Sequence, residues 1–265
     1  MKFKFILPLF ALLIICCSKM PEQTPVDNLS IENIKEDGGD KVLIRVKPKV
    51  GDAQKMLMTM NVNMDEQNMN MNMTSGLDMK VVDRTDSVYT YEIKYNSINM
   101  SMKLDGLEIS FDSEHQDKDG MGYLIYEQLQ PVLNEPTIMT MNDFGEISQV
   151  QLPGSLKMEQ AGDLNSILLP LPKEAVGVGD TWTSLRELGN DSQMEMNMQV
   201  KKITVDDVYI STTGDIRDNN KGKIGEFDGE YRLDRKTGFT RDGTMNLNYT
   251  DDGQNMMMKI NFKSL

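Results

Sequence analysis

Methionine recurs at alternate positions along most of this chain, which has 23 methionines among 265 residues. Asn, Thr or Lys often stands between two of them, as in residues 56–64, 69–73, 100–102, 139–141, 194–198 and 256–258. A period of two places alternate side chains on opposite faces of a β-strand. The pattern therefore predicts a sheet with one face lined by thioethers, and it carries no catalytic signature.

The N-terminus has the features of an export signal. Lys2 and Lys4 precede an apolar run over residues 5–15, which is too short for a stable span of the bilayer. The run ends at Cys16 and Cys17 and resembles the lipobox of bacterial lipoproteins. We expect residues 1–16 to be removed and Cys17 to be acylated, with Cys16 the less favoured acceptor. The alternative is a plain secreted protein whose cysteines are incidental.

Residues 17–40 are polar, contain two prolines and a Gly-Gly pair, and are predicted to be a flexible tether. The acyl chains would attach the protein to the outer membrane, facing the periplasm. The formal net charge of the chain is −13. So acidic a chain repels nucleic acid and offers no basic patch to anionic lipid heads, so no nucleic-acid partner is expected.

Residues 41–265 are predicted to be a single β-rich domain. Alternating segments separated by turn residues indicate a sheet of about eleven antiparallel strands. Thirteen segments are candidates for them: residues 41–47, 53–64, 69–81, 87–104, 107–111, 137–141, 146–152, 181–188, 193–205, 208–213, 223–234, 238–250 and 256–262. Near Asn96 and Ser97 the alternation shifts by one residue, which predicts a β-bulge. Because twist accumulates across so many strands, we expect a large curved sheet or half-barrel of mainly β (α+β) class.

Two segments change to helical spacing. They cover residues 121–133, with Pro131 near the end, and 155–169, and both are expected to cover the concave apolar face of the sheet. Gly145 is predicted to form a hairpin turn. Residues 177–180 are predicted to form a tight turn that delivers Trp182 and Leu185 to the core, although Trp182 also suits the wall of a ligand cavity.

Several motifs resemble a family of methionine-rich Bacteroidota cell-envelope lipoproteins of unknown function. They are Asn-Asp-Phe-Gly-Glu at 142–146, Leu-Pro-Leu-Pro at 169–172, Val-Gly-Val-Gly-Asp-Thr-Trp at 176–182 and Leu-Asp-Arg-Lys-Thr-Gly at 233–238. The likeness extends over most of the chain from about residue 40, and the family brings no assigned activity or site residues. In architecture it is similar to the LolA, LolB and LppX half-barrels, which implies transport of lipidated or hydrophobic cargo.

The sequence does not favour an enzyme. His115, the only histidine, lies in a polar loop, and the mature chain has no free thiol after acylation of Cys17, so we expect no catalytic residues, no cofactor and no metal site built from His or Cys. Residues 117–120 lack the ligand spacing of a calcium loop and are interpreted as a solvated turn. Residues 177–180 likewise lack the Gly-Lys of a phosphate loop.

The methionines leave three interpretations open. They fill a core, they line a cavity for a hydrophobic ligand or lipid, or they bind Cu(I) or Ag(I), or scavenge oxidants, through Met-x-Met strands. Val and Ile specify a strand core better than the flexible Met, which favours an adaptable ligand face. The candidate ligand-binding residues are Met58, Met60, Met71, Met73, Met100, Met102, Met139, Met141, Trp182, Met196 and Met198.

Overall fold

A single antiparallel sheet dominates the computed structural model, which describes residues 41–115, 120–154, 169–189, 192–251 and 253–265. Eleven strands follow one another in the order β6-β5-β3-β2-β1-β12-β11-β10-β9-β8-β7, and β4 pairs with β3 beside that path. The strands are β1 (Ala53–Met64), β2 (Met69–Thr85), β3 (Val88–Leu104), β4 (Leu107–Asp112), β5 (Thr137–Asn142), β6 (Ile147–Gln151), β7 (Thr181–Gly189), β8 (Ser192–Ile203), β9 (Asp207–Asp218), β10 (Gly222–Asp234), β11 (Thr240–Asp251) and β12 (Gln254–Ser264).

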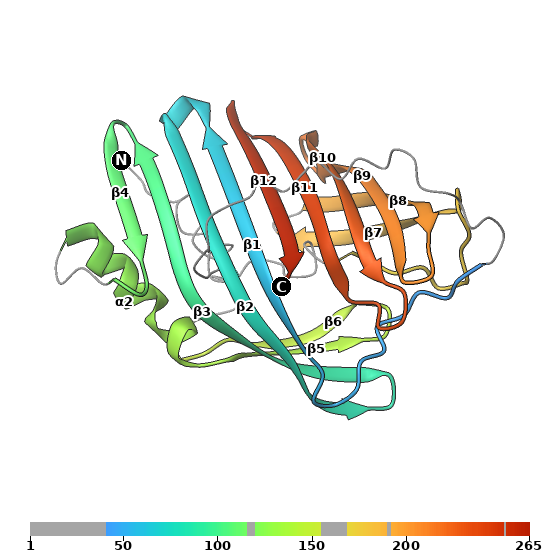
Figure 1. Ribbon diagram of the computed structural model, residues 1–265. Coiled ribbons are helices and arrows are strands. Elements are labelled where there is room, and N and C mark those ends of the chain that lie inside the picture. The colour runs from blue at the N-terminus through green and yellow to red at the C-terminus, as the bar shows by residue number, and fades with distance from the viewer. Residues whose placement is uncertain (1–40, 116–119, 155–168, 190–191, 252) are drawn as a thin grey trace.

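The predicted fold class is confirmed. The sheet is strongly curved and not closed, with β6 and β7 as its two ends, and strands at both ends run across the direction of the central strands (Figure 1). The N-terminal and C-terminal parts of the chain meet in the middle of the sheet, where β1 pairs with β12.

The predicted strand over residues 41–47 is wrong. This segment forms only an isolated bridge between Val42 and Val176. Two more of its backbone N–H groups donate to separate parts of the molecule, that of Val46 to the Asp143 carbonyl and that of Lys47 to the Thr237 carbonyl. The segment is extended and its alternate side chains are buried, but it finds no continuous partner strand.

The bulge predicted near Asn96 and Ser97 is confirmed. Gly76 pairs with Ser97 and Leu77 pairs with Tyr95, so Asn96 is the extra residue in β3. On its other side, β3 pairs with β5 before the bulge and with β4 after it. A bulge bends a strand and increases its twist, which accounts for one long strand serving two different neighbours.

Helix α2 (Gly120–Asn134) confirms the first predicted helix. It directs Ile125, Leu129 and Val132 into a cluster of buried residues from the sheet, and it contacts β3 and β4. Pro131 lies inside its last turn.

The second predicted helix covers residues 155–169, and all of these except Leu169 lie outside the described part of the chain. No helix among the described residues is long and apolar enough to cross a bilayer. A 3-10 turn, η1 (Asp65–Gln67), connects β1 to β2.

The buried residues form two clusters on one face of the sheet, which we call the inner face. The helix-side cluster gathers residues of β1 to β4, β11 and β12 around α2. The strap-side cluster gathers residues of β2, β3, β5 and β8 to β10 around residues 42–46 and 169–176, and we call residues 169–176 the strap. Ile93, Leu247 and Phe262 pack against both clusters, so the inner face is continuous.

Candidate functional site

The strand registers align side chains into rows that cross the inner face. One row runs through ten strands from β4 to β7, and directly paired residues share a face of the sheet. Its members are Phe111, Met100, Met73, Met60, Ile260, Met245, Gly229, Thr212, Met198 and Trp182. All of them are buried except Trp182, which is half-buried at the edge of the sheet. The predicted face lined by thioethers is therefore formed by the pairing of many strands, and no single hairpin accounts for it.

The structure divides the candidate ligand-binding residues between the two clusters. Those in the helix-side cluster are Met58, Met60, Met71, Met73, Met100 and Met102. Those in the strap-side cluster are Met139, Met141, Met196 and Met198, with Trp182 packed against it. All ten methionines are buried, and none is more than 9% exposed.

Met139 and Met141 of β5 line a small cavity at the base of the inner face, which we call the apolar cavity. Its volume is about 130 Å³, and Met56, Met79 and Phe239 contribute to its wall. Apolar cavities of roughly 150 Å³ stay dry and accept small apolar molecules. This site thus suits an apolar group.

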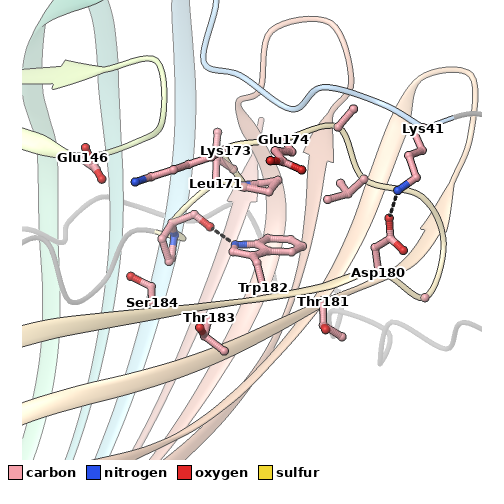
Figure 2. Close-up of a pocket in the computed structure, with 15 residues that line it drawn as sticks. Lys41, Glu146, Leu171, Lys173, Glu174, Asp180, Thr181, Trp182, Thr183 and Ser184 are labelled. Atoms are coloured by element: carbon pink, nitrogen blue, oxygen red, sulfur yellow. Dashed lines mark hydrogen bonds and ion pairs between the residues drawn. The ribbon is translucent and has the colours of Figure 1, made fainter.

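A second, larger cavity lies between the strap and β7, and we call it the seam cavity. It has a volume of about 810 Å³, and it is lined by residues of the strap, by Glu146 before β6, and by the start of β7. It therefore lies at the junction between the two ends of the sheet. The indole of Trp182 occupies its middle, and Nε1 of the indole donates a hydrogen bond of 2.8 Å to the Pro170 carbonyl (Figure 2).

The placement of Leu185 in the core is wrong, because this side chain is 64% exposed. Trp182 pairs with Met198 and Ser184 pairs with Met196, so even-numbered residues of β7 face inward. Leu185 pairs with Glu195 on the outer face. The turn itself is confirmed, since Asp180 N–H donates to the Gly177 carbonyl at 3.1 Å.

Charges of both signs surround the seam cavity. Lys41 forms an ion pair of 3.0 Å with Asp180. The hydrogen bond from the Gly177 N–H, followed by that from Lys41, holds the pKa of the Asp180 carboxyl below its usual value. Lys173 and Glu174 are exposed on the strap, and the Glu146 carboxylate accepts a hydrogen bond from Asn142.

A few polar side chains are buried on or beside the inner face without a hydrogen-bond partner among the described residues. They include the hydroxyls of Ser75, Tyr91, Thr137 and Thr212, and the side-chain oxygen Oε1 of Gln54. Burial raises the pKa of the Tyr91 phenol, so the group stays a neutral donor. Each such hydroxyl is a potential contact for a polar atom within an otherwise apolar interior.

Sequence reasoning missed several cavity residues. Met56 and Met79 belong to the same alternating runs as the chosen methionines, so the signal was present. Phe239 and Leu171 carry no comparable signal, because they lie in irregular segments whose position depends on tertiary contacts.

Comparison with solved structures finds a similar fold in part of lipovitellin. Lipovitellin is 12% identical, with a TM-score of 0.52; the match covers 82% of this chain but only 25% of the lipovitellin chain. A DUF1329 family protein from Desulfovibrio piger is 8% identical, with a TM-score of 0.23, over 82% of this chain and 87% of that protein. No curated protein sequence matches the chain.

The sequence itself matches a family profile over most of its described length. The matched residues are 86–158 and 157–255, which begin at the β2–β3 turn and run to the start of β12. The chain belongs to the DUF6263 family, a family of unknown function.

Proposed function

We propose that this protein is a non-enzymatic envelope lipoprotein that binds a hydrophobic molecule, such as a lipid, against its inner face. One observation carries the proposal: methionines from β1, β2, β3, β8, β11 and β12 lie on one continuous face of an open sheet. An open sheet can separate from whatever covers its inner face without breaking strand pairs.

The choice of methionine supports a binding role. The thioether side chain is flexible and polarizable, and it repacks around objects of different shape at little cost. Burial of apolar surface contributes about 25 cal/mol per Å². A face built in this way favours binding by shape adaptation over recognition of one rigid ligand.

The fold similarity supports the same proposal. Lipovitellin makes lipid–protein interactions. At 12% identity the similarity concerns the fold alone. We infer that a sheet of this shape is suited to hydrophobic cargo, as in the LolA, LolB and LppX half-barrels.

The cellular location is part of the proposal. Acylation of Cys17 would anchor the protein in the outer membrane, with the domain in the periplasm and the tether between them. Substitution of Cys17 by Ala is expected to move the protein from the membrane fraction to the soluble periplasmic fraction. Persistence of Cys17→Ala in the membrane fraction would contradict the anchor.

We propose no catalytic step. The His115 ring contacts Asp112 at 3.0 Å, but it is exposed beside β4, and neither Ser101 nor Ser110 in the same shallow cavity is hydrogen-bonded to it. A serine nucleophile needs its base within hydrogen-bond reach.

Native mass spectrometry of the full-length protein purified from its own envelope tests lipid binding. We expect a co-purifying lipid mass, and exchange with lipid vesicles after delipidation. Met56→Phe fills part of the apolar cavity and should lower lipid occupancy, whereas Met257→Phe on the exposed face should not. A protein that carries no lipid and takes none from vesicles would refute the proposal.

Soft-metal binding is the second candidate function. Met64 lies in register between Met69 and Met256, so three thioethers from adjacent strands meet at the hairpin end of the sheet. Cu(I) prefers such soft ligands. A copper-dependent mass shift that Met64→Leu abolishes would support this function.

A further inference from the structure

The seam cavity and the apolar cavity share a wall. Leu171 of the strap lines both of them and is only 8% exposed. Its neighbour Pro170 lines the seam cavity, and Leu169 lines the apolar cavity. The two spaces therefore meet at Leu171 of the strap.

The two cavities differ in chemistry. The walls of the apolar cavity are mostly apolar, with Met56, Met79, Met139, Met141 and Phe239 among them and Gln54 and Thr240 as the polar side chains. The walls of the seam cavity carry charged and hydroxyl groups, from Lys41, Glu146, Lys173, Glu174, Asp180, Thr181, Thr183 and Ser184. A molecule that occupies both spaces needs a polar head and an apolar chain.

The seam cavity offers groups for a head that carries both charges. Lys41 and Asp180 already pair with each other. In the described part of the chain, Lys173 Nζ and the Glu174 carboxylate have no ion-pair partner, so an anionic and a cationic group can each find a counter-charge there. The Trp182 indole lies between the strap and β7 (Figure 2), and an indole face attracts ammonium groups.

We propose that the seam cavity binds the zwitterionic head of an amphiphile whose chain passes Leu171 into the apolar cavity. This inference rests on the proposed function and names its ligand class. A cavity of about 810 Å³ falls in the range of sites for ligands of drug size. Lys173 binds the anionic group, and Glu174 with Trp182 binds the cationic group.

The position of Lys41 supports this assignment. Lys41, the first described residue, lines the seam cavity, so the chain enters the domain beside it. In the proposed lipoprotein, the acylated Cys17 would stand 24 positions before Lys41 in the sequence.

The strap is held firmly enough to form a defined site. Arg45 donates hydrogen bonds to the carbonyls of Pro172 and Lys173, at 2.6 and 2.5 Å. Trp182 holds Pro170 from the other side. The backbone is hydrogen-bonded on both sides of Leu171, so a chain that passes between the two cavities would have to displace the Leu171 side chain.

Calorimetric titration of the delipidated full-length protein tests the assignment. The probes are four single-chain amphiphiles of equal chain length, used below their critical micelle concentrations: a phosphoethanolamine lysolipid, a phosphoglycerol lysolipid, an alkyl maltoside and a fatty acid. We expect the phosphoethanolamine lysolipid to bind about tenfold more tightly than the others, the size of one charge-assisted contact.

Variants locate the head. Lys173→Glu and Glu174→Lys should each weaken binding of the phosphoethanolamine lysolipid about tenfold, and the double exchange should restore most of the affinity. Lys259→Glu, on the outer face of β12, is the matched control. Leu171→Ala should raise the affinity for longer chains.

The outcomes separate the two proposals. If the four probes bind equally, or if the charge variants bind as the wild type does, the zwitterionic head site is overturned while lipid binding stands. If no probe binds and no lipid co-purifies, both proposals are overturned.

Discussion

The guanidinium of Arg45 donates a hydrogen bond of 2.6 Å to the carbonyl oxygen of Pro172, across 127 residues of sequence. The same nitrogen bonds to the Ile44 carbonyl, and the guanidinium stacks 4.2 Å from the centre of the Phe144 ring. Arg45 is only 8% exposed. A buried cation that satisfies backbone carbonyls connects the N-terminal segment, the strap and the β5–β6 turn at one point.

Arg45→Met should therefore loosen the strap and reduce the free energy of unfolding by about 2 kcal/mol, since the carbonyls lose their donors while a buried charge is removed. Trp182 is the only tryptophan and donates a hydrogen bond to the strap. In native Arg45→Met its fluorescence emission should therefore lie at longer wavelength than in the native wild type. Urea unfolding followed by fluorescence measures both effects. Lys47→Met, at an exposed position of the same segment, is the control. An unshifted native emission spectrum of Arg45→Met would show that Arg45 does not hold the strap.

Met257 and Met258 are neighbours on β12 that test the inner face directly. Met258 is 5% exposed and belongs to the helix-side cluster, whereas Met257 is 45% exposed. Met258→Ala should lower the free energy of unfolding by about 2–5 kcal/mol through the lost contacts and the resulting cavity. Met257→Ala should change it by less than about 0.5 kcal/mol. Chemical denaturation of both variants makes the comparison, and equal losses would contradict the assignment of faces.

The alternation of apolar and polar residues was sufficient to predict which side chains face inward. Met60 and Met198 lie 138 positions apart in sequence numbering, yet both face the interior, because a period of two determines the face of a strand locally. The bulge at Asn96 was visible for the same reason. Leu185 was misplaced because Trp182 and Leu185 are three residues apart, and two residues at that spacing cannot share one face of a regular strand.

The order of the strands in the sheet and the position of the cavities could not be predicted from the alternation of residues. No local signal shows that β1 pairs with β12, or that residues 42–46 lie against the strap instead of joining the sheet. Arg45 looks like an ordinary surface residue in the sequence, and its role arises only when distant carbonyls converge on it. Both cavities depend on those long-range contacts.

Asp234 provides a prediction for acidic solution. Burial raises the pKa of its carboxyl, but hydrogen bonds from Thr237, Lys236 and Arg241 outweigh burial and place the pKa below the usual value. A lowered folded-state pKa contributes stability above the unfolded-state pKa of about 3.9, and that stability is lost as pH falls through the folded-state value. Asp234→Asn should therefore destabilise the protein at pH 6 and approach the wild-type stability near pH 2. Thermal unfolding across this range measures the difference, and a constant difference would contradict the role of the charge.

Glycine at position 214 should be required by packing on the inner face. A Cβ atom there would lie 2.5 Å from the Phe227 ring and would overlap the Glu195 carbonyl oxygen. Phe227 pairs with Gly214 across the strands, so the ring covers the space that a side chain would fill. Gly214→Ala should lower the free energy of unfolding by about 1–3 kcal/mol, because a carbonyl in the sheet cannot move away without breaking the ladder. Gly177→Ala is the matched control, since a Cβ there meets its nearest neighbour, Lys41, at an ordinary 3.6 Å. Urea unfolding of the two variants measures the difference in the free energy of unfolding. If Gly214→Ala is as stable as Gly177→Ala, the inner face near β9 and β10 can accommodate an added methyl group, and the packing requirement is contradicted.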